Sequence, residues 1–184
     1  MLPVIGSKVT NQLEIFEMLD FNNRNSNQQI LKRRPLDVKR EEHVAYDLFL
    51  EENFKLMDHM CRSFGSAQGA KLIKQQFSQK NADLQSRFPG LRWEIIEKGK
   101  TPIGIVAYEL TQTEMCVADI ILYPQFRSRG FGRIIIQELL VLAKSHHVQM
   151  RLVVGKTNTR AQRLYKELGF KEAEQSDKQV VMEQ

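Results

Sequence analysis

The sequence has few of the residues that build metal sites and disulfide frameworks. Its 184 residues include 2 cysteines and 4 histidines. Cys61 and Cys116 lie far apart, and neither a CxxC pair nor a Cys/His ligand spacing occurs. Zinc sites and small disulfide-rich proteins require such short spacings. We therefore expect neither a metal nor a disulfide framework, and we interpret the histidines as surface or helix-end residues.

A long apolar run is also missing. The N-terminal stretch MLPVIGSKVTNQ has no basic region ahead of an apolar segment, and no run approaches the roughly 20 apolar residues of a membrane helix. With 42% hydrophobic and 27% charged residues, the composition is that of a soluble globular protein. The length suits one well-filled domain. We expect a cytoplasmic protein with no membrane partner.

Turn residues and apolar patterning divide the first half of the chain. Residues 1–29 end in the Asn/Gln-rich stretch DFNNRNSNQQ, which is typical of a loop or a loosely docked arm. The pattern predicts a first strand over residues 30–35. It then predicts a long helix from an N-cap at Asp37 towards Arg62, and a second helix over residues 70–88. We interpret residues 1–29 as an N-terminal extension and residues 30–184 as the domain.

Strands and helices alternate in the second half. Strand-like runs occupy residues 91–99, 101–110, 115–124 and 148–154, and the Gly99–Lys100 pair indicates a hairpin. Helices are predicted over residues 134–144 and 158–170, with a left-handed C-terminal cap at Gly169. The tail from Lys171 has room for one or two strands. This order predicts an α/β (α+β) domain with a mixed sheet.

Positive charge is concentrated in the stretch RSRGFGR, residues 127–133, and no Asp or Glu occurs between Asp119 and Glu138. Gly130 and Gly132 have no Cβ, so their backbone can approach a ligand closely. The first amides of the next helix lack internal partners and carry partial positive charge. With the three arginines, this pattern favours a phosphate-binding loop. A glycine-rich turn with solvated arginines is the alternative.

The loop matches neither of two well-known phosphate-binding motifs. The third glycine of the dinucleotide fingerprint is missing, and the glycine stretch contains no GKS or GKT of a P-loop. Downstream, Asn158 and Tyr165 are seven residues apart and share one face of the predicted helix. Taken singly, Asn158 is most simply an N-cap and Tyr165 a half-buried core tyrosine.

Two stretches together resemble the GNAT superfamily of N-acetyltransferases. LYPQFRSRGFGRIIIQELL is similar to motif A of that family, whose core Arg/Gln-x-x-Gly-x-Gly/Ala falls on residues 127–132, with Ser128 where glycine is common. NTRAQRLYKELGF resembles motif B, Asn-x-x-Ala-x-x-Leu-Tyr-x-x-x-Gly-Phe, at every named position. The resemblance covers roughly residues 92–172. It implies a mixed, mainly antiparallel central sheet flanked by about four helices.

The resemblance also implies acetyl-CoA as cosubstrate, no metal, and transfer of the acetyl group to a primary amine through a tetrahedral intermediate. The strand ending in Ile120, Ile121 and Leu122 would offer backbone groups to the pantetheine arm and polarise the thioester carbonyl. Tyr165 would protonate the CoA thiolate. The remaining cofactor-binding residues would be the pyrophosphate loop and the residue that bonds the cofactor arm: Arg127, Ser128, Arg129, Gly130, Phe131, Gly132, Arg133 and Asn158.

The general base and the acceptor are less sharply indicated. Asp119 is the candidate base, with Glu114 as an alternative, and deprotonation through water needs neither. The acceptor is an amine-bearing small molecule or peptide. Glu41, Glu42, Glu51, Glu52 and Asp58 could attract it, although an ordinary solvated helix face is the interpretation we prefer for them. Residues 1–29 lie outside the resemblance and are available to cover the acceptor groove or a partner in a homodimer.

Two other function classes remain open from the sequence. One is a GNAT-like module that binds CoA without turnover. The other is a nucleic-acid-binding protein, suggested by a net charge of +5. Such proteins interleave basic residues with exposed aromatics, whereas here the phosphate loop already accounts for the densest basic cluster. We therefore expect an acetyltransferase without a nucleic-acid partner.

Overall fold

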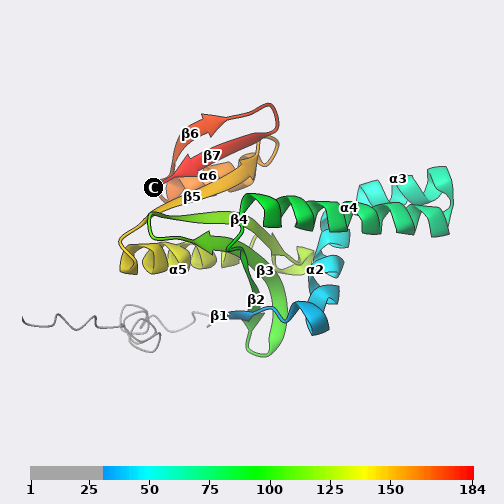
Figure 1. Cartoon of the computed structure of the whole chain (residues 1–184), viewed down its shortest axis with the longest axis horizontal. Helices are drawn as coiled ribbons and strands as arrows, with labels where there is room; N and C mark the ends of the chain where they lie inside the picture. Colours follow the sequence, from blue (N-terminus) through cyan, green and yellow to red (C-terminus); the bar gives the residue numbers. More distant parts are fainter. Residues whose placement is uncertain (1–30) are drawn as a thin grey trace, which may run out of the picture. The chain divides into compact units, whose positions relative to one another are not determined.

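Seven strands form one sheet in the order β1-β2-β3-β4-β5-β7-β6 (Figure 1). The computed structural model describes residues 31–184, so Ile30 and the predicted extension over residues 1–29 lie outside the described part. The β4–β5 pair is parallel and the other five neighbouring pairs are antiparallel, which confirms the predicted mixed, mainly antiparallel sheet. The strands are β1 Leu31–Pro35, β2 Arg92–Lys98, β3 Thr101–Leu110, β4 Glu114–Leu122, β5 Gln149–Gly155, β6 Lys171–Gln175 and β7 Gln179–Glu183.

The helices cover both faces of this sheet. They are α2 Val38–Glu52, α3 Phe54–Phe64, α4 Ser66–Arg87, α5 Phe131–Ser145 and α6 Thr159–Glu167, with a short 3₁₀ turn η1 at Pro124–Phe126. One apolar core joins α5 and α6 to one face, around residues such as Val117, Ile135 and Leu152. A second core joins α2 and α4 to the opposite face, around Leu48 and Ile73. None of the helices within residues 31–184 is both long and apolar enough to span a bilayer.

The N-terminal helices differ from the prediction. The expected single helix from Asp37 towards Arg62 is wrong, because α2 ends at Glu52 and α3 begins at Phe54. At the junction the Asn53 side chain donates a 2.8 Å hydrogen bond to the Phe49 carbonyl, and this competes with helix propagation. Beyond Gly65, α4 begins earlier than predicted. The described residues therefore hold five α-helices, and α3 lies beside α4 as a hairpin (Figure 1).

Several local predictions are confirmed. Asp37 caps α2 by accepting a 3.1 Å hydrogen bond from the Lys39 amide. Gly99 turns the β2–β3 hairpin at φ 65°. Gly169 ends α6 at φ 93°, and the Phe170 amide donates back to the Tyr165 carbonyl at 3.0 Å. This last bond closes the Schellman motif that the Gly-Phe pair indicates.

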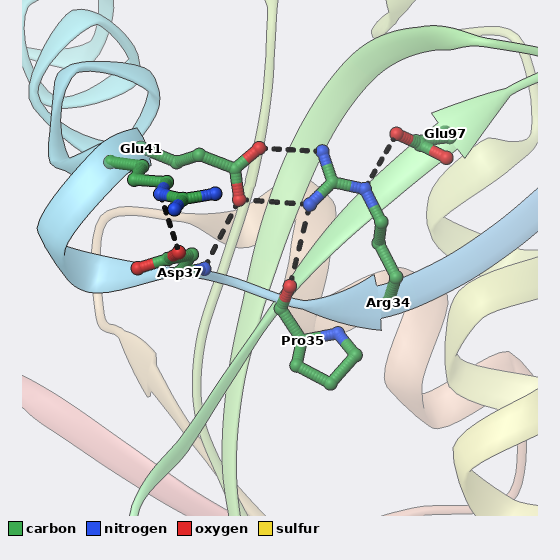
Figure 2. Close-up of polar contacts among 6 residues, drawn as sticks. Arg34, Pro35, Asp37, Glu41 and Glu97 are labelled. Carbon is green, nitrogen blue, oxygen red and sulfur yellow. Dashed lines mark hydrogen bonds and ion pairs between the residues drawn. The ribbon is translucent and has the colours of Figure 1, made fainter.

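Arg34 ties the first strand to its two neighbours (Figure 2). Its guanidinium donates two hydrogen bonds to the Glu41 carboxylate, at 2.7 and 2.8 Å, and one to Glu97 at 2.8 Å. The Asp37 amide donates to Glu41 at 3.1 Å. Arg34, followed by the Asp37 amide, lowers the pKa of Glu41 to about 2. The start of α2 is thereby fixed to β1 and β2.

A one-residue bulge at Ala118 changes which way β4 faces. Asp119 pairs with Ala107 and Val117 with Tyr108, so Ala118 has no partner on β3. Before the bulge, Met115 and Val117 lie in the core under α5. Beyond it, Ile121 lies in the core under α2 and α4. Because side chains alternate along a strand, the extra residue also places Asp119 on the α4 side.

The two parallel strands pair over only part of their length. Residues 114–117 of β4 pair with residues 149–152 of β5, whereas residues 151–155 of β5 pair with β7. The last four residues of β4, 119–122, have β3 as their only strand partner within the described part. The fork between β4 and β5 thus begins at the bulge.

Candidate functional site

A cleft of about 690 Å³ lies between the end of β4, the loop that enters α5, and α6. Its volume falls in the range of small-molecule sites. Nine of the residues predicted for the site line it: Ile120, Leu122, Arg127, Ser128, Gly130, Gly132, Arg133, Asn158 and Tyr165. The fold therefore brings together two sequence motifs, the first ending at Leu140 and the second beginning at Asn158.

The loop into α5 has an unusual backbone. Ser128 has φ 66° and Gly130 has φ 85°, both in the left-handed region. Gly130 is the N-cap of α5, no side chain caps the helix, and no acidic residue lies in its first turn. Such turns expose successive amides in an anion-binding concavity, and the helix dipole strengthens it. The amides of Phe131 and Gly132 thus remain available to an anionic ligand.

The arginines around the loop have different roles. Arg127 donates from Nε to the Leu122 carbonyl at 2.7 Å, which anchors it to the end of β4. Arg133 forms an ion pair with Glu167, so α6 supplies a carboxylate that is absent from the loop sequence itself. Arg129 is exposed and is not part of the lining.

Two arginines of α6 were missed by the sequence reasoning. Arg160 and Arg163 both line the cleft, and Arg160 donates a 2.6 Å hydrogen bond to the Ser128 hydroxyl. Both stand at variable positions of the second motif, so only their spacing on the face that includes Asn158 could have indicated them. With Arg127 and Arg133, the cleft has four arginines against two glutamates, Glu52 and Glu167.

Asn158 and Tyr165 lie on the cleft face of α6. Asn158 is also the N-cap of the helix, since its Oδ1 accepts a 3.1 Å hydrogen bond from the Ala161 amide. Its side-chain NH₂ remains free to donate elsewhere. The Tyr165 ring packs against Phe170 at 6.0 Å, but its hydroxyl has no hydrogen-bond partner among residues 31–184. Burial, and then the charge of Asp119, raise the pKa of Tyr165 to about 12. The hydroxyl therefore keeps its proton at neutral pH.

Asp119 belongs to a second cleft, of about 500 Å³, on the α4 side of the fork. Polar residues of α4, the bulge residue Ala118, and the ends of β5 and β7 complete its lining. Asp119 Oδ2 lies 2.7 Å from Lys80 Nζ. Asp119 does not line the first cleft, although its charge raises the pKa of Tyr165 there.

Two further predicted residues turn their side chains elsewhere. Ile121 is buried in the core under α2 and α4, and Phe131 is buried under α5 beside Phe126. Only their backbone groups are available to a ligand.

Glu52 is a further lining residue that the sequence reasoning had assigned to a solvated helix face. It is the last residue of α2 and lines the first cleft together with Leu122 and Arg127. Its carboxylate lies 3.9 Å from Lys80 Nζ. Burial, and then the charge of Asp119, raise its pKa, while Lys80 and Arg127 oppose the shift.

Comparisons with known proteins agree with the resemblance of the two motifs. A profile of the acetyltransferase (GNAT) family matches residues 53–170. The chain is 24% identical over 154 residues to CgeE of Bacillus subtilis (strain 168), described as an uncharacterized N-acetyltransferase. That alignment covers 73% of this chain, and this chain spans only 60% of the length of CgeE.

Solved structures share the fold. The PaiA N-acetyltransferase of Thermoplasma acidophilum, in complex with coenzyme A, is similar at 15% identity and a TM-score of 0.61, over 84% of this chain and 98% of that one. A GNAT acetyltransferase of Elizabethkingia anophelis with acetyl-CoA bound is similar at 12% identity and a TM-score of 0.56, over 85% and 98%. The family match extends over more than half of the sequence. It contains the β4 residues that line both clefts, the loop of residues 127–133, and α6. The chain belongs to the GNAT acetyltransferase family.

Proposed function

We propose that this protein is an N-acetyltransferase that moves the acetyl group of acetyl-CoA to a primary amine. The observation that carries the proposal is the uncapped, left-handed entrance to α5, which faces a cleft with four arginines beside the β4–β5 fork. The CoA and acetyl-CoA complexes of structures with the same fold support it.

The cleft fits the chemical parts of acetyl-CoA. The amides of residues 128–133, with Arg160 and Arg163, would hold the pyrophosphate. The end of β4, which has no β5 partner there, would hydrogen-bond the pantetheine arm, and Asn158 would hold that arm from α6. The thioester carbonyl would then receive backbone donors from the fork, where charge develops during acyl transfer.

The second cleft would admit the acceptor from the opposite face of the sheet. It shares the fork with the first cleft, and its α4 wall is polar, with Gln79, Lys80 and Asp83 among the lining residues. An amine needs hydrogen-bond acceptors and carboxylates near the reacting carbon, and Asp119 stands there. The acceptor would be an amine-bearing small molecule or peptide.

Direct attack by a neutral amine would give a tetrahedral intermediate, which collapses as the carbon–sulfur bond breaks. Tyr165 would donate its proton to the departing sulfur. A phenol whose pKa is about 12 is a weak acid beside an ordinary thiol at about 8.5. Burial in the same cleft raises the pKa of a thiol as well, so the pKa values of the phenol and the thiol lie closer together there.

The proposal is tested by thermal unfolding with two thioesters. A ligand at about 100 times its Kd stabilises a protein by ~2.7 kcal/mol, which corresponds to roughly 5–10 °C for a domain of this size. Acetyl-CoA should give such a shift, and acetyl-pantetheine, which lacks the nucleotide phosphates, much less. Equal shifts would remove the phosphate-loop argument. Thiol release against a panel of polyamines, aminoglycosides, amino acids and peptides would then separate a catalyst from a CoA-binding module without turnover.

A further inference from the structure

Glu52 is a partly exposed glutamate that lines the first cleft. It ends α2, yet it lines the cleft that we assign to acetyl-CoA, together with Leu122 and Arg127. The side chain is 37% exposed, so a proton can reach it from solvent. Its neighbour Glu51 is exposed and does not line this cleft.

The charges that face Glu52 come from three elements. Asp119 on β4 repels its negative charge, whereas Lys80 on α4 and Arg127 ahead of α5 attract it. Burial is the largest influence, and the net result is a pKa above the ordinary value of 4.5. A carboxylate whose pKa is raised towards neutral pH is a better proton acceptor there than a carboxylate with an ordinary pKa.

Asp119, the base expected from the sequence, is already engaged. Its Oδ2 lies 2.7 Å from the Lys80 ammonium, whereas Glu52 lies 3.9 Å from the same nitrogen. Protonation of Asp119 would break the close ion pair. Protonation of Glu52 would give up only a contact at the outer limit of an ion pair.

We propose that Glu52 is the general base that accepts the proton of the acceptor ammonium, directly or through one water, while the Lys80–Asp119 pair positions the acceptor side of the fork. This inference rests on the proposed function. The nitrogen lone pair then forms the carbon–nitrogen bond, and the carbon–sulfur pair leaves with sulfur. Sulfur takes the Tyr165 proton, the second proton of the nitrogen restores Tyr165 through solvent, and Glu52 releases its proton to water. One amide, one thiol and one proton result.

The test compares two probe amines in three variants. Benzylamine is protonated at neutral pH and needs a base, whereas methoxyamine is already uncharged. In Glu52→Gln, kcat/KM for benzylamine should fall by ~10²–10⁴. The inflection at the pKa of Glu52 should be lost, leaving only the rise that follows deprotonation of benzylamine itself, whereas the methoxyamine rate should change only a few-fold. The matched control Glu51→Gln should behave like the parent. An equal loss with both amines, or a benzylamine-selective loss in Asp119→Asn in place of Glu52→Gln, would overturn the proposal.

A second measurement needs no turnover. Carbon-13 NMR titration of the glutamate carboxyls, assigned by the signal missing in Glu52→Gln, should place the pKa of Glu52 above 4.5. An ordinary value would overturn the proposal. Calorimetry with acetyl-CoA distinguishes failure of the proposed function from failure of the role proposed for Glu52. Failure to bind would overturn the proposed function together with this role, whereas binding with an ordinary Glu52 pKa would overturn this role alone.

Discussion

Replacing Tyr165 by Phe removes one oxygen and leaves the ring where it is. The contact with Phe170 at 6.0 Å is retained, and the lost hydroxyl has no partner among residues 31–184. A typical hydrogen bond contributes 0.5–1.5 kcal/mol, and none is broken here, so unfolding free energy should change by less than about 0.5 kcal/mol. If the hydroxyl donates to sulfur, turnover should fall by ~10²–10⁴, or about 2.7–5.5 kcal/mol of barrier.

Tyr108→Phe is the matched control with the reverse expectation. Tyr108 is 3% exposed, donates a 2.8 Å hydrogen bond to Glu94, and lines neither of the two clefts. Hydrogen bonds to charged groups contribute about 1.5–3 kcal/mol. The partial exposure of Glu94, 17% of its side chain, lets water replace part of the loss. Stability should therefore fall by about 1.5 kcal/mol while turnover stays close to the parent.

Turnover is measured as thiol release from saturating acetyl-CoA with an acceptor identified from the panel. Stability is measured by urea unfolding of each variant. The KM for acetyl-CoA should change little in Tyr165→Phe, because the proton is needed only as the bond breaks. A folded Tyr165→Phe variant with parental turnover would refute the acid role. So would a pattern in which both variants lose stability and rate in parallel, since that marks a structural tyrosine.

Three other changes have defined outcomes. Gly132→Glu should fold, because its Cβ would meet only the Leu164 side chain at 3.6 Å. Its acetyl-CoA affinity, measured by calorimetry, should fall about 100-fold, since like charges brought together cost several kcal/mol. Unchanged affinity would place the phosphate elsewhere. Glu41 has a lowered pKa, so the stability it contributes is present above pH 4.5 and is lost as pH falls through about 2. Glu41→Gln should therefore be less stable to urea than the parent at pH 6, and this difference in stability should shrink towards pH 2. In Gly104→Ala a Cβ would lie 2.3 Å from the Ile121 carbonyl oxygen. This overpacking should reduce stability by about 1–3 kcal/mol and weaken acetyl-CoA binding. A variant with parental stability and affinity would contradict this expectation.

The elements that the sequence predicts well are those with local causes. The Gly99–Lys100 turn, the Asp37 cap and the Gly169–Phe170 cap each depend on residues within one turn of chain. The break between α2 and α3 was missed, because an Asn inside a helical pattern can face solvent or bond to the backbone. In the structure the Asn53 side chain donates to the Phe49 carbonyl, and the sequence pattern does not distinguish this from a solvent-facing Asn.

The same distinction separates the site residues. The loop of residues 127–133 is recognisable because the phosphate contacts proposed for it depend on its own backbone. Glu52, Lys80, Arg160 and Arg163 enter the clefts only through tertiary packing, and in sequence they are ordinary helix-surface charges. Even the three loop arginines have different surroundings in the folded protein. Arg133 pairs with Glu167, Arg127 donates to the Leu122 carbonyl, and Arg129 is not part of the cleft lining.

A single inserted residue on β4 accounts for why this strand lines clefts on both faces of the sheet. Without the bulge at Ala118, Asp119 would continue on the Val117 face and lie in the apolar core under α5. With it, Asp119 faces Lys80 on one side of the sheet, while Ile120 and Leu122 line the cleft on the other. The bulge coincides with the last β4–β5 pair, so the strands separate where the side chains change face. The fork and the placement of its carboxylate are thus consequences of the same irregularity.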